Sequence, residues 1–125
     1  MKLNLKEISR MTKFNLDDMT RGWFIGNFSP TSYLTDSCEV AVKHYKKDDY
    51  EQKHFHKIAT EITVISSGTV RIGEEVYTSG DIIRIEPGTA VDFLALSDTT
   101  TVVVKIPGAL DDKYLSSEIN EPKSC

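Results

Sequence analysis

The sequence predicts an all-β fold that forms a single domain. Short runs of β-branched and aromatic residues recur at intervals of about ten residues, with glycine or proline at most of the joints between them. No helical period of useful length competes with this pattern. Strands spaced in this way are typical of an antiparallel sandwich or barrel. Because 125 residues suffice to bury one core without cross-links, we expect one domain over residues 1–125.

Each expected strand rests on its own local pattern. The run from Gly22 to Phe28 is aromatic and β-prone, and the turn residues Ser29 and Pro30 end it. Residues 38–46 alternate apolar and polar side chains over part of their length, which is the period of a half-buried strand. Further β-rich runs predict strands at 61–66, 69–72, 82–85, 91–96 and 100–106. Between two of these runs, Gly73-Glu74 predicts a tight hairpin.

Three segments lack such patterns. Residues 1–20 mix charged and scattered apolar side chains, so we expect an N-terminal arm or strand and no separate domain. Residues 46–52 are charged and predict an exposed loop. Residues 109–125 are rich in Asp, Ser, Glu and Lys, and predict a polar tail that is either a short helix over the barrel mouth or disordered.

The pair His54 and His56, followed by Glu61, is the main candidate for chemistry. On a strand, residues i and i+2 share a face, so the two imidazoles can converge on one metal ion while Phe55 points away. Two histidines and one carboxylate are the ligands of the non-haem iron facial triad, which leaves coordination positions open for substrate or water. The ligand types leave iron, manganese, nickel, cobalt and zinc all open.

The spacing of these residues resembles the first signature motif of the cupin superfamily, HxHxxxxE followed by a glycine. That motif is His54, His56, Glu61 and Gly68. The second motif is matched at Gly80, Asp81 and Gly88, with Pro87 moved by one place as in the Pro-Pro-Gly variants of the family. Where the second motif has its histidine, this chain has Val91. The resemblance covers roughly residues 37 to 107. It implies an antiparallel jelly-roll β-barrel whose motif residues point into the barrel mouth, and at most three of the family's four usual metal ligands.

Other side chains are candidates for the missing ligand or for substrate contacts. His44 can point inward if its parity matches that of Val40 and Val42, and Gln52 lies just ahead of the motif. Asp92 follows the vacant position, but one step along a strand places it on the opposite face. Arg84 interrupts an apolar run and is a candidate for an anionic ligand, as are Lys43 and Lys57, although solvated faces usually carry such residues. Aromatic side chains that could stack on a sugar or base, but more often pack in the core, are Tyr45, Tyr77 and Trp23.

Glu61 has two functional interpretations, metal ligand or general base. A carboxylate inside an apolar barrel has its pKa raised unless a cation or metal is paired with it, and a raised pKa makes a usable base near neutral pH. The first hypothesis is therefore a metal-dependent enzyme, such as an isomerase, an epimerase or a dioxygenase, acting on a sugar or an oxygenated acid. The alternative is a non-catalytic sugar- or nucleotide-binding module in which Val91 marks a lapsed metal site. A third is metal-free isomerisation with a histidine base and Tyr45 or Tyr77 as acid.

The composition limits the classes of binding partner that we expect. There are 15 basic and 19 acidic side chains, so a net charge of −4 disfavours nucleic acid or an anionic membrane as partner. No apolar run approaches signal-peptide or membrane-span length, and we expect a soluble, cytoplasmic protein with Cys38 and Cys125 as free thiols. Several strands are apolar at both parities, so either an N-terminal segment packs outside them or two protomers share the sheet. Because proteins that resemble cupins are often dimers, we predict a homodimer.

Overall fold

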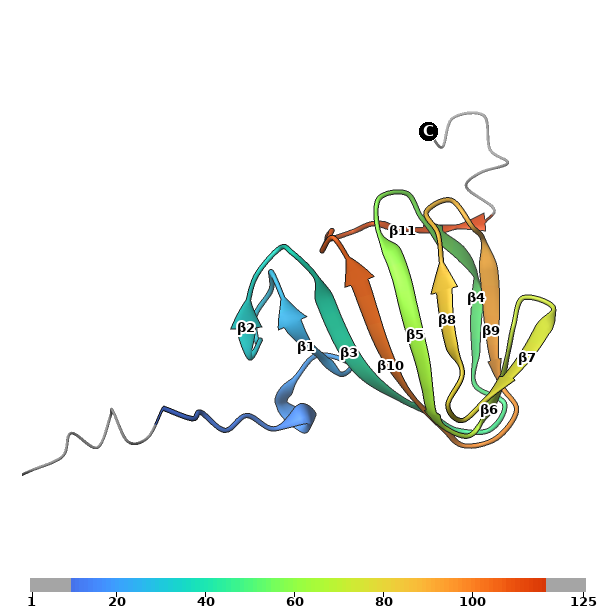
Figure 1. Ribbon diagram of the computed structural model, residues 1–125, viewed down its shortest axis with the longest axis horizontal. Coiled ribbons are helices and arrows are strands. Elements are labelled where there is room, and N and C mark those ends of the chain that lie inside the picture. Colours follow the sequence, from blue (N-terminus) through green and yellow to red (C-terminus); the bar gives the residue numbers. More distant parts are fainter. Residues whose placement is uncertain (1–9, 117–125) are drawn as a thin grey trace, which may run out of the picture.

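The computed structural model describes residues 10–116, which form two facing β-sheets that close into a barrel (Figure 1). The first sheet has the strand order β2-β1-β3-β10-β5-β8, and the second has the order β11-β4-β9-β6-β7. The elements are η1 (Leu16–Asp18), β1 (Trp23–Gly26), β2 (Tyr33–Leu34), β3 (Glu39–Tyr45), β4 (Tyr50–His56), β5 (Thr60–Ser67), β6 (Thr69–Ile72), β7 (Glu75–Thr78), β8 (Ile82–Ile85), β9 (Val91–Ala95), β10 (Thr99–Ile106) and β11 (Lys113–Leu115). Among the described strands, only β1 and β2 pair in parallel. The all-β antiparallel jelly roll expected from the sequence is confirmed.

Two segments differ from the expectation. The expected charged loop at 46–52 is shorter, because Tyr50 and Glu51 already pair with β9. The first part of the polar tail is a strand, β11, which pairs antiparallel with β4. Its Tyr114 ring stacks on Phe55 with the ring centroids 5.4 Å apart. The polar composition of the tail does not predict this contact. Residues 117–125 of the tail and residues 1–9 of the expected arm lie outside the described residues.

The hydrophobic core fills the end of the barrel at which β5 passes into β6. Its buried members are Ile65, Val70, Ile72, Phe93 and Ala95, contributed by both sheets. The turn between β5 and β6 is made by Gly68, whose φ of +95° is open to glycine and strained for other residues. A Cβ at this position would overlap the carbonyl oxygen of Asp98, so both the backbone angle and the packing require glycine here.

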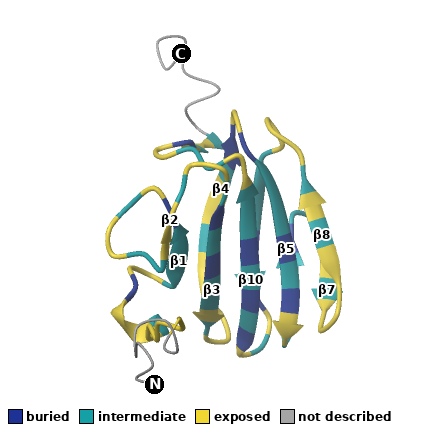
Figure 2. Ribbon diagram, turned by 60° about the vertical axis from the view of Figure 1, so that its left-hand side comes forward, coloured by how far each residue is buried: buried dark blue, intermediate teal, exposed yellow. Residues whose placement is uncertain are grey.

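Strand register decides which side chains of the first sheet face the barrel interior. The inward row nearest the open end is Glu39, Lys105, Glu61 and Ile85, and the next is Ala41, Val103, Thr63 and Ile83. The outward face carries the row Val42, Val102, Val64 and Ile82 and the row Val40, Val104, Ile62 and Arg84. Figure 2 shows buried positions alternating with less buried ones along β3, β10 and β5, while β8 at the edge is largely exposed. The inward row nearest the open end therefore carries both acidic and basic side chains, whereas the outward rows are apolar except at Arg84.

Candidate functional site

The open end of the barrel holds a cavity of about 550 Å³ lined by both sheets. Of the residues singled out from the sequence, its walls include His54, His56, Glu61, Tyr45 and Val91. Trp23 and Lys43, which the sequence favours as packing and solvated residues, also line it. The cavity is therefore the candidate functional site.

The two histidines lie on one side of β4, as their spacing predicts. Their ring centroids are 5.5 Å apart and the rings stand nearly perpendicular, at 80°. Phe55 between them points to the other side, where it packs against β11. His56 is 6% exposed and lines the cavity.

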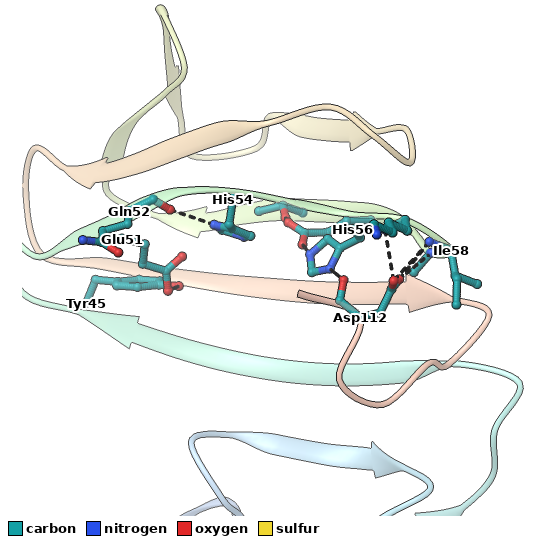
Figure 3. A network of polar contacts seen from close by, with 11 residues as sticks. Tyr45, Glu51, Gln52, His54, His56, Ile58 and Asp112 are labelled. Atoms are coloured by element: carbon teal, nitrogen blue, oxygen red, sulfur yellow. Dashed lines mark hydrogen bonds and ion pairs between the residues drawn. The ribbon is translucent and has the colours of Figure 1, made fainter. Parts of the chain in front are cut away.

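Main-chain carbonyls fix the tautomer of both rings (Figure 3). Nδ1 of His56 donates to the carbonyl oxygen of Asp112 at 2.9 Å, and Nδ1 of His54 donates to the carbonyl oxygen of Gln52 at 2.9 Å. A carbonyl oxygen only accepts, so the proton of each neutral ring is on Nδ1 and the lone pair is on Nε2. Proteins orient metal-binding histidines through the same kind of contact. Burial also lowers the pKa of His54, which favours its neutral form.

Glu61 meets His56 across the cavity. Its Oε1 lies 3.2 Å from Nε2 of His56, and its Oε2 accepts a hydrogen bond from the hydroxyl of Thr63 at 2.8 Å. Burial raises the pKa of Glu61, but its contact with His56 and the hydrogen bond from Thr63 outweigh burial, and the net pKa lies below its ordinary value. Glu61 is therefore an ionised carboxylate at neutral pH, which suits a ligand better than a general base.

The contact between His56 and Glu61 requires a positive charge. Because Nδ1 of His56 already donates to Asp112, Nε2 approaches the carboxylate favourably only with a second proton or with a cation between the two groups. Imidazole nitrogens and a carboxylate oxygen are ligands for several divalent ions, so the donor types fit a metal. As they stand, however, no three His, Cys, Asp or Glu side chains within residues 10–116 are grouped closely enough to hold one ion. His56 and Glu61 are in contact, and the ring of His54 lies beside His56 with the ring centroids 5.5 Å apart.

Val91 takes the position at which the second motif has its histidine. It pairs with His54 across β4 and β9 and lines the cavity. Its apolar side chain packs against the core cluster and offers no donor atom. The neighbouring Asp92 does not replace it, because its carboxylate is bound by Arg71 at 2.9 Å and by the hydroxyl of Tyr50 at 2.9 Å. The fourth ligand of the family pattern is thus absent from this strand.

Several candidates from the sequence have side chains that do not line the cavity, among them His44, Gln52 and Arg84. His44 shares the parity of Val40 and Val42, as required, but that parity faces outward, and its ring contacts the hydroxyl of Thr100 at 3.0 Å. The side chain of Gln52 is exposed, and only its carbonyl contributes, by holding His54. Arg84 is on the outer face and pairs with Glu86 at 2.7 Å.

Tyr45 does line the cavity, but its surroundings oppose acid catalysis. Its hydroxyl donates to Oε2 of Glu51 at 3.1 Å (Figure 3). Burial and the adjacent Glu51 carboxylate raise the pKa of Tyr45 far above its ordinary value, so it gives up a proton poorly near neutral pH. Tyr77 packs against the core and is not part of the cavity wall. Both results weigh against isomerisation with a tyrosine acid.

Sequence reasoning missed several residues of the site. Asp112 lies in the predicted polar tail, yet it is 3% exposed and its carboxylate accepts the N–H groups of Lys57, Ile58 and Ala59. Glu51 reaches the cavity because the pairing of β4 with β9 shifts register between Glu51 and His54, which no local pattern reveals. Lys105 carries a weak signal, since it shares the inward parity of Val103 in the sequence.

Comparisons with solved structures identify the fold. A conserved protein with a double-stranded β-helix domain from Klebsiella pneumoniae is 22% identical, with a TM-score of 0.57 over 65% of this chain and 76% of that chain. KdgF from Halomonas sp. is 16% identical, with a TM-score of 0.58 over 62% of this chain and 76% of that chain. Oxalate decarboxylase from Bacillus subtilis is 14% identical, with a TM-score of 0.60 over 68% of this chain but 25% of that longer chain.

No protein-family model and no curated protein sequence matches the chain. The structural likeness, at these identities, defines the class of protein by its fold: a double-stranded β-helix, which is the cupin fold. The resemblance inferred from the two motifs is confirmed at this level. Within residues 10–116 there is no helix with the length and apolar character needed to cross a membrane.

Proposed function

We propose that this protein binds one divalent metal ion through His54, His56 and Glu61 and uses it to act on a small polar metabolite. The observation that carries the proposal is the approach of Nε2 of His56 to Oε1 of Glu61 at 3.2 Å, with Nδ1 of His56 held by a carbonyl. Two electron-rich groups aimed at one point need a positive charge between them. A divalent ion supplies that charge, and His54 adds a second Nε2 with the same tautomer.

A bound ion in this cavity would act as a Lewis acid and as a template for oxygen atoms of the substrate. The protein groups have separate roles. Asp112 and Gln52 orient the two imidazoles through their carbonyls, Thr63 orients the Glu61 carboxylate, and the barrel walls exclude bulk water. Support for metal chemistry comes from one neighbour of the same fold, since the oxalate decarboxylase of Bacillus subtilis has Mn(II) centres.

Metal content measured by mass spectrometry tests this proposal. Protein purified untagged, without added metal or chelator, is compared with the double variant His54→Ala/His56→Ala and with His44→Ala. His44 is the matched control, because it is a strand histidine outside the cavity. We expect near-stoichiometric metal in the wild type and in His44→Ala, and its loss in the double variant together with turnover. Retained turnover in a metal-free double variant would contradict the proposal.

Val91 favours a second candidate, a non-catalytic module that binds a sugar or nucleotide in the cavity. A lapsed site explains an apolar residue opposite His54 and the absence of a grouped three-ligand set among the described residues. Ligand binding that chelators leave unchanged would support this candidate. A second outcome would also support it: the wild type binds no metal after reconstitution with iron, manganese, nickel or zinc, whereas Val91→His binds stoichiometric metal.

The outward face of the first sheet supports a homodimer. Two rows of β-branched residues cross β3, β10 and β5 on this face. On β8 one row continues to Ile82, which is 68% exposed, and the other ends at Arg84. An apolar face of this kind is unusual on a monomer, so we expect a second copy to cover it. Sedimentation at micromolar concentration should give the mass of two chains, and Ile82→Lys should shift the equilibrium toward one chain. A wild-type mass of one chain would defeat this expectation.

A further inference from the structure

Two lysines on the first sheet point into the cavity without ion-pair partners. Lys43 comes from β3 and Lys105 from β10, and their ammonium groups lie 5.3 Å and 4.8 Å from the ring centroid of Trp23. Neither ammonium forms a salt bridge with any carboxylate in the part of the chain that the structure describes. The indole ring thus has two cations beside it, held by cation–π contacts alone.

Burial makes these two charges costly. Desolvation lowers the pKa of both Lys43 and Lys105. The Glu51 carboxylate offsets part of this effect at Lys43, and the carboxylates of Glu39 and Glu61 offset part of it at Lys105. Those carboxylates act from a distance and do not contact the ammonium groups. A half-buried charge without a partner is unfavourable, so the part of the cavity that both lysines line favours an anion.

A third side chain in the same wall is also unsatisfied. Thr101 pairs with Lys43 across β3 and β10, lines the cavity and is 1% exposed. Its hydroxyl oxygen is buried and has no hydrogen-bond partner among residues 10 to 116. The other inward threonines differ, because Thr63 donates to Glu61 and Thr99 donates to main-chain carbonyls. Buried hydroxyls in proteins are nearly always bonded, so the Thr101 hydroxyl calls for a partner that the protein does not supply.

We propose that Lys43, Lys105 and Thr101 form an oxyanion subsite that binds a carboxylate or phosphate group of the substrate. This inference deepens the proposed function and rests on it, because it treats the bound anion as the substrate. The ligand is an organic anion with its acidic group on the first sheet and its reacting oxygen atoms at His54, His56 and Glu61. The ammonium groups neutralise the charge and the hydroxyl donates the hydrogen bond. Trp23 fixes the position of both lysines.

The single tryptophan of the chain gives a direct assay, since Trp23 is the only source of indole fluorescence. Inorganic phosphate and malonate are titrated separately at constant ionic strength, with chloride as the blank, and calorimetry on the same titrations detects binding that leaves the fluorescence unchanged. We expect saturable binding of at least one probe. Lys43→Met and Lys105→Met should each weaken it by about tenfold or more, the size expected for a lost contact to a charged group.

Matched variants separate the subsite from general effects. Lys57→Met is the control, because Lys57 also lies over an aromatic ring, that of Tyr114 at 4.3 Å, but outside the cavity. Thr101→Val should weaken binding several-fold while Thr101→Ser retains it. If the methionine variants fail to fold, Lys43→Gln and Lys105→Gln take their place. Preference for phosphate or for malonate identifies the acidic group.

Absence of saturable binding for both probes would overturn the subsite, as would wild-type affinity in both the Lys43 and the Lys105 variants. Zinc titration of the same variants keeps the two proposals apart. If Lys43→Met loses the anion and keeps zinc, the subsite is supported and the metal site is untouched. If His54→Ala/His56→Ala and the wild type both bind the anion and neither binds zinc, the metal proposal fails while the subsite stands.

Discussion

Removal of the Asp112 carboxylate should destabilise the barrel at the site end. This side chain is 3% exposed and accepts the main-chain N–H groups of Lys57, Ile58 and Ala59 at 2.9 to 3.2 Å. It thereby closes the turn between β4 and β5, while its own carbonyl holds His56. Asp112→Ala leaves three donors without an acceptor, next to the most buried histidine of the site.

The magnitude follows from how far water can replace the carboxylate. Hydrogen bonds to a charged acceptor contribute about 1.5–3 kcal/mol each. Ala59 is buried, so its N–H loses that contribution in full, whereas Lys57 and Ile58 are exposed and their N–H groups recover part of theirs from water. After allowance for the desolvation of the carboxylate, we expect the free energy of unfolding to fall by about 3 kcal/mol.

Urea denaturation measures this loss. For an m value of about 2 kcal/mol/M, the midpoint should fall by about 1.5 M with little change in m. Asp98→Ala is the control, because Asp98 is exposed and accepts one main-chain hydrogen bond, from Lys47 at 2.9 Å. That variant should lose less than about 1 kcal/mol. A loss below 1 kcal/mol in Asp112→Ala, equal to the control, would refute the role given to the buried carboxylate.

Three further outcomes are expected. Thr101→Val removes an unpartnered buried hydroxyl at constant shape, so thermal melting without ligand should show a gain of about 1 kcal/mol, and a loss would mean that the hydroxyl is bonded. Gly68→Ala places a Cβ against the carbonyl of Asp98 at positive φ, and should cost about 2–4 kcal/mol in the same assay; an unchanged melting temperature would contradict the turn geometry. The hydrogen bond from Arg71 lowers the pKa of Asp92 in the folded protein. The pair therefore stabilises the fold at pH values above the pKa of Asp92 in the unfolded chain, and this stabilisation is lost as the pH falls through the pKa of Asp92 in the folded protein. The stability lost in Arg71→Met should therefore be constant near neutral pH and shrink from about pH 5 downward, and a loss independent of pH would exclude the ion pair as its cause.

The fold was largely predictable because strand period and turn residues are local signals. Gly73-Glu74 makes the expected two-residue hairpin between β6 and β7, and the motif residue Gly68 makes the turn between β5 and β6. Strand β11 was missed because its stability comes from partners far along the chain, above all from Tyr114 against Phe55. Composition alone describes that segment as a polar tail.

The site was predictable only where it depends on spacing along one strand. His54 and His56 share a face because they are two residues apart, and the motif places Glu61 near them. Lys43 points inward and His44 outward because of the face of β3 that meets the other sheet. The sequence does not identify that face, because β3 carries apolar residues on both faces. Only tertiary packing chooses between them.

A crystal soaked in zinc tests whether His54, His56 and Glu61 bind one ion together. We predict one anomalous peak inside the barrel, at about 2.0–2.2 Å from Nε2 of both histidines and from a carboxylate oxygen of Glu61. The carbonyl contacts of both Nδ1 atoms should be retained. A barrel without a peak, in which His56 and Glu61 remain directly hydrogen-bonded at saturating zinc, would contradict the claim.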